Sequence, residues 1–230
     1  VKKKKKIKKN YDEQLIEQIT NTLEMLLDKG FVYTYNDLRR EYIDENTIRL
    51  SWNNHLSGAF NAGNNFLKLE QYKQIINNNS YLCILFDGSL IRVSYTIKNE
   101  HIIGHNLLWW PAPYKYSGVS LDDVSPNQLL LDFLEDDKWY DHMEMRSPIR
   151  IDYDPRKEVV SPTHPPVHMH IEHMNCRIFI EQPMCFNSFI KLIFNNFYPD
   201  CKIYLDRNDY IAFDVDDNYE YIEGLTKIVC

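Results

Sequence analysis

Half of the histidines of this 230-residue chain lie in one short segment, residues 164–173. If residues 167–173 form a strand, His168, His170 and Glu172 share one face, because side chains alternate between the two faces of a strand. Two imidazoles at this spacing can bind one metal ion, or can act as a general acid and a general base. The segment is therefore the first candidate for a functional site.

A second segment offers charged partners for these histidines. Arg150, Asp152 and Asp154 also alternate with apolar residues, so they face one way if the segment is a strand. A carboxylate beside an imidazole sets the tautomer of the ring and raises its pKa, and an arginine stabilises charge on a phosphate. If the two strands are neighbours, we expect Arg150, Asp152 and His168 to converge at a solvent-accessible groove. The alternative is a surface ion pair of little energetic weight.

Metal binding is another use of the histidines. We predict no bound cofactor; if a divalent metal binds, its expected ligands are His164, His168 and His170. The five cysteines are widely spaced and include no C-x-x-C pair, which argues against a structural zinc site and against a disulfide framework. Reduced thiols indicate a cytoplasmic protein. No apolar stretch approaches the ~18 residues of a membrane span, so no membrane contact is expected.

The elements that position these residues follow from hydrophobic periodicity. Apolar residues at helical spacing predict four helices, over residues 12–28, 65–76, 126–137 and 187–198. Gly30 suits the C-terminal cap of the first helix, and Asn187 can cap the start of the last.

Strands are predicted wherever apolar and polar residues alternate or a short apolar run occurs. The expected ranges are 81–86, 91–97, 101–110, 147–153, 167–173, 176–181, 201–205 and 210–215. The strands occur in blocks, with helices between the blocks, so we predict an α+β fold: a largely antiparallel sheet with about four packed helices. Trp109 and Trp110, at the end of one strand, form either an exposed aromatic docking ledge or part of the core.

Charge is unevenly distributed along the chain. Seven of residues 1–9 are lysines, and because like charges repel we predict a disordered basic tail over residues 1–10. Residues 11–230 are predicted to form a single α+β domain, helical over about 11–78 and sheet-rich over about 79–230. Without the tail lysines, 19 basic residues face 33 acidic ones, a net charge of −14. Such a body repels phosphate backbones, so contact with nucleic acid is expected through the tail or a partner.

Six groups of residues, taken in order, resemble a known family. They are Asp87-Gly88-Ser89 with Ile91 and Tyr95, Pro111-Ala112-Pro113, Arg150 to Pro155, His164-Pro165 with His168, Asn175 to Ile178, and Phe189 to Tyr198. Their order resembles that of a bacterial and phage-related family of unknown function, encoded beside helicases in anti-phage defence loci. The resemblance covers most of residues 60–200. The chain departs from the family at Phe179, where proline is usual, and at His170, where a hydroxyl residue is usual; the second departure favours His168 over His170.

The resemblance implies an accessory or effector protein of bacterial anti-phage defence. Such a protein acts with a helicase or another protein of the defence locus, and cleaves or senses nucleic acid. The enzymatic version is a metal-independent nuclease or phosphodiesterase. Its candidate catalytic residues are His168, His164, Asp152, Arg150 and Arg177. In this scheme His168 is the general base or acid, Asp152 orients it, and the two arginines hold phosphate.

The alternative function is that of a non-catalytic adaptor or regulatory subunit, which docks a basic partner through its acidic body and aromatic surface. The net charge favours the adaptor, whereas the clustered histidine, aspartate and arginine residues favour the enzyme. Geometry separates the two hypotheses, because catalysis requires residues 150–154 and 164–170 to lie within hydrogen-bond reach in a cleft.

Overall fold

The computed structural model of the chain describes residues 10–52, 55, 69–114, 128, 131–132, 135, 143–144, 146–171 and 176–213, and the backbone of residues 227–228. Its helices are α1 (Tyr11–Asp28), α2 (Leu69–Asn77), α4 (Phe186–Phe197) and a short 3-10 helix, η3 (Arg207–Asp209). Its strands are β1 (Val32–Tyr35), β2 (Arg39–Asp44), β3 (Thr47–Ser51), β4 (Cys83–Leu85), β5 (Leu90–Lys98), β6 (His101–Trp110), β7 (Ile149–Tyr153), β8 (Val167–Ile171), β9 (Ile178–Ile180) and β10 (Lys227–Ile228).

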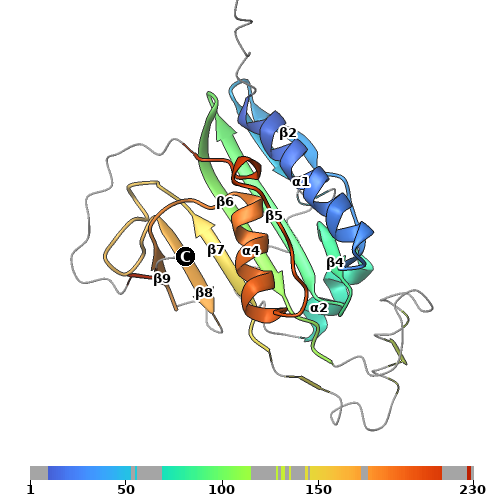
Figure 1. The fold of residues 1–230 in the computed structure, drawn as a ribbon. Helices are drawn as coiled ribbons and strands as arrows, with labels where there is room; N and C mark the ends of the chain where they lie inside the picture. Colours follow the sequence, from blue (N-terminus) through green and yellow to red (C-terminus); the bar gives the residue numbers. More distant parts are fainter. Residues whose placement is uncertain are drawn as a thin grey trace, which may run out of the picture.

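The strands form one ten-stranded sheet in the order β1-β4-β5-β6-β7-β8-β9-β10, and β3 pairs with β5 while β2 lies outside β3. Every pairing between the described strands is antiparallel except that of β9 with β10. Helices α1 and α4 contact each other and lie on the same face of the sheet (Figure 1). The arrangement confirms the predicted α+β class and the largely antiparallel sheet.

The end of α1 shows how local sequence stops a helix. Gly30 has a φ of +71°, a conformation that costs glycine little because it has no Cβ. The Gly30 amide donates to the Leu27 carbonyl, and the Phe31 amide donates to the Leu26 carbonyl. These two bonds form a Schellman motif, which satisfies carbonyls that the last helical turn leaves open. The expected role of Gly30 is confirmed.

Three α-helices have defined bounds in the described part of the chain, where about four were predicted. α1 and α4 match the predictions for 12–28 and 187–198. α2 begins at Leu69, and residues 65–68 of the predicted helix lie outside the described residues. Of the predicted helix 126–137, only positions 128, 131, 132 and 135 are described, and all four are helical.

The sequence led us to expect that Asn187 caps the start of α4, and this prediction is wrong. The N-cap of this helix is Cys185, and the side chain of Asn187 is buried. Its Oδ1 accepts a hydrogen bond of 2.7 Å from the Thr22 hydroxyl, and its Nδ2 donates to the Asp209 carbonyl at 2.8 Å. Asn187 therefore joins α4 to α1 and to the segment around η3, because a buried amide needs partners that the helix start alone does not supply.

Two groups of strands differ from the predictions. Residues 201–205 and 210–213 are irregular rather than extended strands, while 214–215 lie outside the described residues. The Asp209 carbonyl accepts hydrogen bonds from side chains of α1 and α4, so this segment packs beside the helices instead of joining the sheet.

In addition, β1 to β3 lie within residues 11–78, a part predicted to be mainly helical. Their β-branched and aromatic residues favour strands, and β3 extends the sheet by pairing with β5.

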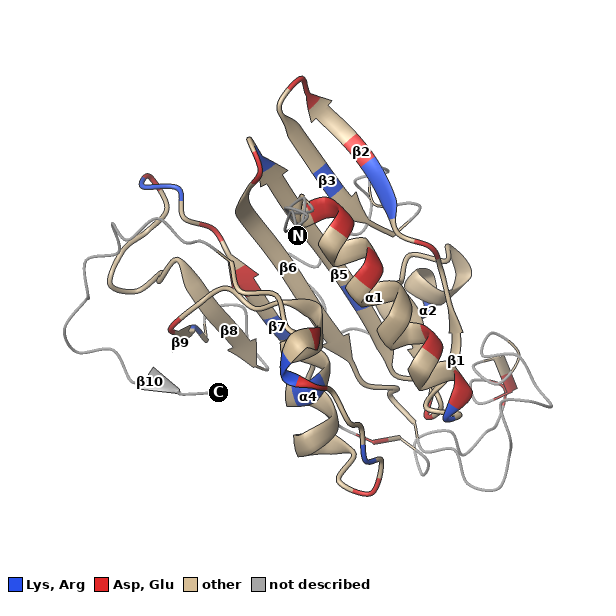
Figure 2. Ribbon diagram, turned by 45° about the horizontal axis from the view of Figure 1, so that its top comes forward, with Lys and Arg blue, Asp and Glu red and all other residues tan. Residues whose placement is uncertain are grey.

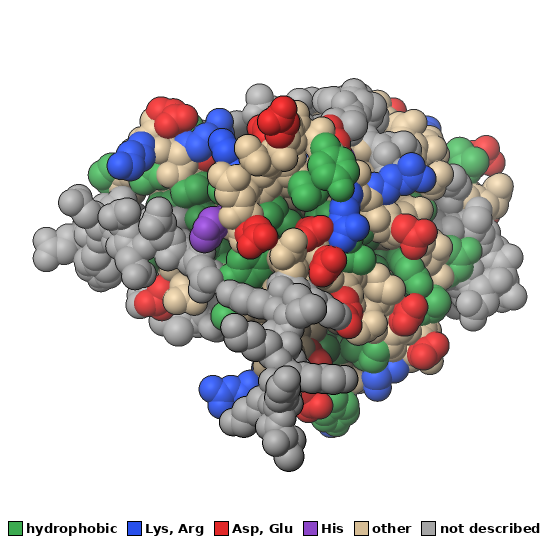
Figure 3. Space-filling model, turned by 90° about the horizontal axis from the view of Figure 1, so that it is seen from above, with side chains coloured by type: hydrophobic (Ala, Val, Ile, Leu, Met, Phe, Trp, Pro, Cys, Tyr) green, Lys and Arg blue, Asp and Glu red, His purple; other side chains and the backbone are tan. Residues whose placement is uncertain are grey.

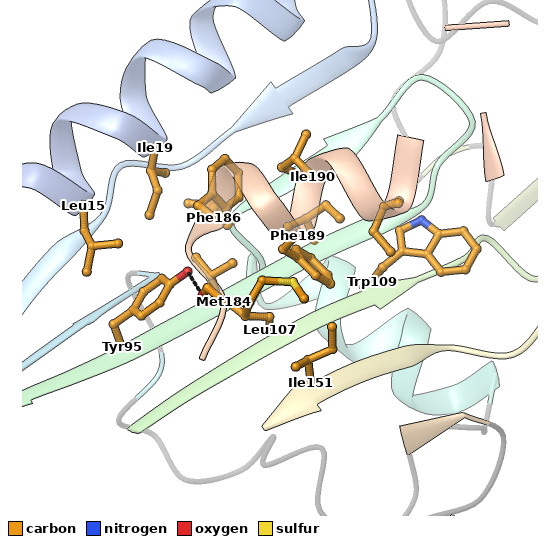
Figure 4. Close-up of a cluster of buried hydrophobic side chains, with 14 of the residues drawn as sticks. Leu15, Ile19, Tyr95, Leu107, Trp109, Ile151, Met184, Phe186, Phe189 and Ile190 are labelled. Atoms are coloured by element: carbon orange, nitrogen blue, oxygen red, sulfur yellow. Dashed lines mark hydrogen bonds between the residues drawn. The ribbon is translucent and has the colours of Figure 1, made fainter. Parts of the chain in front are cut away.

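The main hydrophobic core lies between the sheet and the two helices α1 and α4. Figure 4 shows its central side chains: Leu15, Ile19, Tyr95, Leu107, Trp109, Ile151, Met184, Phe186, Phe189 and Ile190. The Tyr95 hydroxyl donates a hydrogen bond of 3.2 Å to the Met184 carbonyl, so the one polar atom of this ring is paired. We call this side of the sheet the helix face.

The opposite side, which we call the second face, is strongly apolar only at one end. There α2 packs Tyr72, Ile75 and Ile76 against the sheet in a smaller core. Trp109 and Trp110 are consecutive, so they point to opposite faces, and they are only 1% and 5% exposed. Each indole belongs to one of the two cores, and the interpretation of the pair as an exposed docking ledge is wrong.

The basic tail, residues 1–10, lies outside the described residues apart from Asn10. Within the described part of the chain, no helix combines the length and the apolar character that crossing a membrane requires.

Candidate functional site

The pairing of β7 with β8 brings the two polar segments together. The strands run antiparallel, with Arg150 opposite His170 and Asp152 opposite His168. Residues directly opposite each other in an antiparallel pair point to the same face, so all four side chains lie on the second face. The predicted juxtaposition of Arg150, Asp152 and His168 is confirmed, but the expected solvent-accessible groove is not, because His168 is 1% and Arg150 8% exposed. We call these residues, with His170, the Asp152 cluster.

The cluster belongs to a polar row that crosses the sheet. The register of successive strand pairs places Ser94 of β5 opposite Asn106 of β6, Asn106 opposite Asp152, and Asp152 opposite His168. Four neighbouring strands thus contribute one polar side chain each at the same level of the second face. Such a row is unusual for a sheet centre, where burial of polar groups is costly unless they pair with each other.

Asp152 is the common partner within the cluster. Its Oδ1 accepts a hydrogen bond of 2.6 Å from the Asn106 side-chain amide. Its Oδ2 lies 2.9 Å from Nε of Arg150, 3.3 Å from Nε2 of His170 and 3.9 Å from Nε2 of His168. Burial opposes ionisation of this carboxyl group, but the hydrogen bond with His170 and the charge of Arg150 outweigh it and lower the pKa of Asp152. The carboxylate is therefore ionised at neutral pH.

His168 is held from the side opposite to Asp152. Its Nδ1 lies 2.7 Å from the Pro165 carbonyl, which only accepts hydrogen bonds, so Nδ1 carries the proton. The ring is 1% exposed, and burial lowers its pKa to about 4. In this neutral tautomer, the lone pair of Nε2 is directed towards Asp152. The Pro165 carbonyl, rather than Asp152, therefore fixes the tautomer of His168.

His170 is as deeply buried as His168. Its ring packs edge-on against that of His168, with 4.7 Å between the ring centres. Its Nε2 contacts Asp152, whereas its Nδ1 is buried and makes no hydrogen bond to the described residues. One ring nitrogen of His170 thus contacts the Asp152 carboxylate, and the other has no hydrogen-bond partner among the described residues.

His164 and Arg177 lie at the edge of the Asp152 cluster. The half-buried ring of His164 packs edge-on against His168, with 4.7 Å between the ring centres. Burial and the nearby charge of Arg177 lower the pKa of His164. Arg177 is also half-buried and immediately precedes β9, the strand next to β8. All five sequence-predicted site residues therefore lie in one region of the second face.

Asp154, which the sequence placed beside Asp152, does not belong to this arrangement. Asp154 was expected on the same face as Asp152, but its carboxylate pairs with the exposed Arg156, with 2.6 Å between Oδ2 and Nη2. The hydrogen bond from Arg156 lowers the pKa of Asp154 and outweighs burial, which acts in the opposite direction. Glu172 lies outside the described residues.

The Asp152 cluster also contains a set of metal-ligand atoms. One ligand atom each from Asp152, His168 and His170 lies within 4.8 Å of the other two. The ligands expected from the sequence were His164, His168 and His170. The structure replaces His164 with Asp152, because the antiparallel register places Asp152 opposite His168, and its carboxylate also reaches His170. Among the described residues this is the group of side chains that can hold a metal ion.

Asn106 and Pro165 are functional neighbours that the sequence analysis missed. Asn106 orients the carboxylate, and Pro165 orients the imidazole through its main chain. Asn106 stands in β6, which pairs with β7, so pairing the predicted strands in sheet order would have identified it. No side-chain signal reveals a backbone carbonyl such as that of Pro165.

A second buried polar group has a structural role. The carboxylate of Asp87 accepts hydrogen bonds from the amide and hydroxyl of Ser89, from Arg146 and from the Tyr198 hydroxyl. The Ser89 hydroxyl in turn accepts from the Ala112 amide. These bonds hold the turn after β4 against the end of β6 and the end of α4. The landmarks at 87–89, 111–113 and 198 are thus accounted for by folding alone.

Comparison with known proteins places most of the chain in one family. The family model described as "Uncharacterized conserved protein (DUF2290)" matches residues 31–214. The matched range runs from the residue before β1 to the residue after Phe213, so it contains the whole Asp152 cluster. No curated protein and no solved structure matches the chain.

Proposed function

This chain belongs to the conserved family DUF2290, and we propose that it is an effector of bacterial anti-phage defence that acts with a helicase and hydrolyses nucleic-acid phosphodiesters at the Asp152 cluster. The proposed role in anti-phage defence beside a helicase comes from the resemblance to a family encoded beside helicases. The chemistry comes from one observation: acid–base and cationic side chains from the two strands β7 and β8 converge on a single carboxylate. Clusters of this kind, with perturbed pKa values, concentrate at functional sites.

The charges on the second face support recognition of a phosphate. Arg150 is 8% exposed and Arg92 is 3% exposed, and both lie in the same row of the sheet with only Leu108 between them. The guanidinium of Arg92 also stacks on Trp52, 4.1 Å from the ring centre. Buried guanidinium groups favour an anionic ligand because the low dielectric around them strengthens their field. Asp152 balances the charge of Arg150, so this face offers a phosphate guanidinium groups rather than a large net positive charge.

In the proposed reaction, Arg150 and Arg177 bind the phosphate, and the group formed by Asp152, His168 and His170 activates a water molecule. The water oxygen forms a bond to phosphorus, and the bond between phosphorus and the leaving sugar oxygen breaks. One proton leaves the attacking water for the solvent, and one proton from the solvent reaches the leaving oxygen. The half-buried His164 lies where the cluster approaches the surface.

The experiment that tests this function uses the full chain together with the helicase encoded beside it. Labelled single- and double-stranded DNA and RNA are incubated with wild type, with Asp152→Asn and with Arg156→Ala, whose guanidinium pairs with Asp154 outside the cluster. We expect turnover of one substrate by wild type and Arg156→Ala, and loss of turnover in Asp152→Asn. No turnover of any substrate in the presence of the helicase would contradict the proposal.

A second candidate function, the adaptor, is favoured by the charge of α1. Its exposed residues Glu13, Glu17, Glu24 and Asp28 are acidic, and the helix contains no lysine or arginine. Figure 2 shows the acidic residues along α1, and acidic side chains are spread over the face seen in Figure 3. Such a surface suits a basic partner. If Asp152→Asn keeps defence activity while charge reversal at Glu17 and Glu24 abolishes partner binding, the adaptor function replaces the enzymatic one.

A further inference from the structure

We propose that Asp152, His168 and His170 bind one divalent transition-metal ion of the zinc class, with a fourth coordination position open to a water molecule. Binding of the ion follows from the geometry of this chain alone. Its use in hydrolysis rests on the proposed function, which it deepens by naming the group that activates the water.

Two of the three spacings between the ligand atoms can be compared with those of a tetrahedral site, and the third, between His168 and His170, is at most 4.8 Å. Metal–ligand bonds of about 2.0–2.1 Å place neighbouring ligand atoms of a tetrahedral zinc ion about 3.3 Å apart. Oδ2 of Asp152 and Nε2 of His170 are 3.3 Å apart, and the same oxygen is 3.9 Å from Nε2 of His168. A shift of a few tenths of an ångström at His168 brings its nitrogen to the required distance.

The hydrogen bonds around the site favour a cation over a proton. Because Nδ1 of His168 donates to the Pro165 carbonyl, its Nε2 presents a lone pair towards the Asp152 carboxylate. Two electron-pair donors that face each other across 3.9 Å are stabilised by a positive ion between them. A metal-bound histidine almost always donates its other ring N–H to a carbonyl or carboxylate. His168 meets this rule through Pro165, whereas Nδ1 of His170 has no such partner among the described residues, so the hydrogen bonds support His168 as a ligand more strongly than His170.

The carboxylate is held in the matching orientation. Asn106 donates to Oδ1 of Asp152, which leaves Oδ2 directed at the two imidazoles. The side chain of Asp152 is 20% exposed, whereas those of both histidines are 2% exposed. An ion at this position would have three protein ligands, and the partly exposed Asp152 is the side from which a water molecule could reach a fourth position, as in catalytic rather than structural sites.

The ligand types select the kind of metal. Imidazole nitrogens suit zinc, iron, nickel and copper, whereas magnesium and calcium require oxygen ligands. Arg150 lowers the affinity for any cation, because its guanidinium lies 2.9 Å from the same Oδ2. A carboxylate oxygen has two lone pairs, so the arginine and the metal can share it, but their charges repel each other. Removal of this guanidinium is expected to tighten metal binding.

The test is calorimetric titration of the metal-free full chain, prepared without a histidine tag, with Zn²⁺ and separately with Mg²⁺. We expect one Zn²⁺ per chain and no saturable binding of Mg²⁺. Asp152→Asn, His168→Gln and His170→Gln should each weaken Zn²⁺ binding by more than about 10-fold, and Asn106→Leu, which removes only the orienting amide, by about 10- to 100-fold. Arg150→Gln should strengthen binding, and His101→Gln, at an exposed histidine of β6, should leave it unchanged.

A thermal melt of each variant separates lost binding from lost folding. Zn²⁺ should raise the melting temperature of wild type and of His101→Gln, but not that of a folded His170→Gln variant. Wild type without Zn²⁺ binding, or ligand variants that bind Zn²⁺ as wild type does, would overturn the proposed site. Zn²⁺ binding without turnover leaves the metal site standing and removes the hydrolytic function. Turnover by a wild type that shows no Zn²⁺ binding removes the metal site and leaves the hydrolytic function standing.

Discussion

At the scale of single residues, Asp152 determines the character of the second face. One carboxylate neutralises a buried arginine, accepts from an asparagine amide and contacts two imidazoles. A buried ion pair adds little net stability when both partners are present, because each charge has lost its hydration. Loss of one partner is costly, because the other charge stays buried without compensation. The cluster is therefore better understood as a functional group than as a stabilising one.

The first prediction follows from this asymmetry. Asp152→Asn keeps the shape of the side chain but leaves Arg150, whose side chain is 9% exposed, without its counter-charge. We expect the free energy of unfolding to fall by about 3 kcal/mol in urea titrations. The matched change Asp154→Asn removes a carboxylate whose partner Arg156 is 65% exposed, and should cost less than about 0.5 kcal/mol. Equal losses in the two variants would show that Arg150 is not buried as described.

The second prediction concerns pH and the buried His105 of β6. Its ring is 5% exposed, and Nε2 accepts a hydrogen bond of 3.0 Å from the Met184 amide. Burial lowers its pKa from 6.5 to about 4. Between these two values the unfolded chain binds a proton that the folded chain does not, so folding stability falls as the pH falls. The contribution of neutral His105 to the free energy of unfolding is fully present above pH 6.5 and is lost progressively as the pH falls towards 4.

The measurement compares wild type with His105→Gln, which retains a hydrogen-bond acceptor but does not titrate. Between pH 7.5 and pH 5 we expect wild type to lose about 2 kcal/mol more unfolding free energy than the variant. His55 and His168 also have a pKa of about 4, so the variant keeps part of the pH dependence. Parallel pH profiles for the two proteins would contradict a neutral, buried His105.

At the scale of elements, strand register decides which residues meet. A shift of one residue between β7 and β8 would move His168 and His170 from the second face to the helix face, among the apolar side chains of the main core. Val167 and Met169 of β8 oppose such a shift, because they are buried in that core and would move to the polar second face. The hydrophobic alternation of the two strands thus protects the geometry of the cluster.

The third prediction concerns the end of α1. Gly30→Ala places a Cβ on a residue with a φ of +71°, although the surrounding space is empty. We expect a loss of about 1 kcal/mol in unfolding free energy, entirely from backbone conformation. Gly30→Asn should lose less, because asparagine tolerates the left-handed conformation at this position. Identical urea midpoints for wild type and Gly30→Ala would mean that the Schellman motif does not limit the helix.

At the scale of the whole molecule, charge separates the tail from the body. The nine N-terminal residues carry seven lysines, and the remainder has a net charge of −14. Long-range attraction of nucleic acid by the body is therefore unfavourable, and the guanidinium groups of the second face act only at short range. This distribution fits a protein that receives its substrate from a partner rather than capturing it from solution.

The fourth prediction concerns the tail. Deletion of residues 1–9 should change the melting temperature by less than about 1 °C, because like-charged, hydrated lysines contribute no core. If the tail helps to bind nucleic acid, the same deletion should weaken binding at low salt and reduce its salt dependence. A fall of several degrees in the melting temperature would show that the tail packs against the body.

Much of the fold was determined by short-range patterns in the sequence. Apolar residues at helical spacing predicted α1 and α4, and alternation or short apolar runs predicted β5 to β9, because each pattern needs only its own residues to define a buried side. The segment 201–213 shows the limit of this reasoning. It has residues suited to strands, but the buried amides of Gln18 and Asn187 bond to the Asp209 carbonyl and hold it beside the helices.

The Asp152 cluster also depends partly on sequence patterns and partly on tertiary contacts. The sequence by itself determined that Arg150 and Asp152 share one face of a strand and that His168 and His170 share one face of another, since side chains alternate with a period of two residues. Only the tertiary structure decided that these faces meet, that Asn106 joins them from β6, and that the Pro165 carbonyl rather than Asp152 sets the tautomer of His168. The physical reason is that alternation specifies the face on which a side chain lies, whereas partner and register depend on contacts between distant parts of the chain.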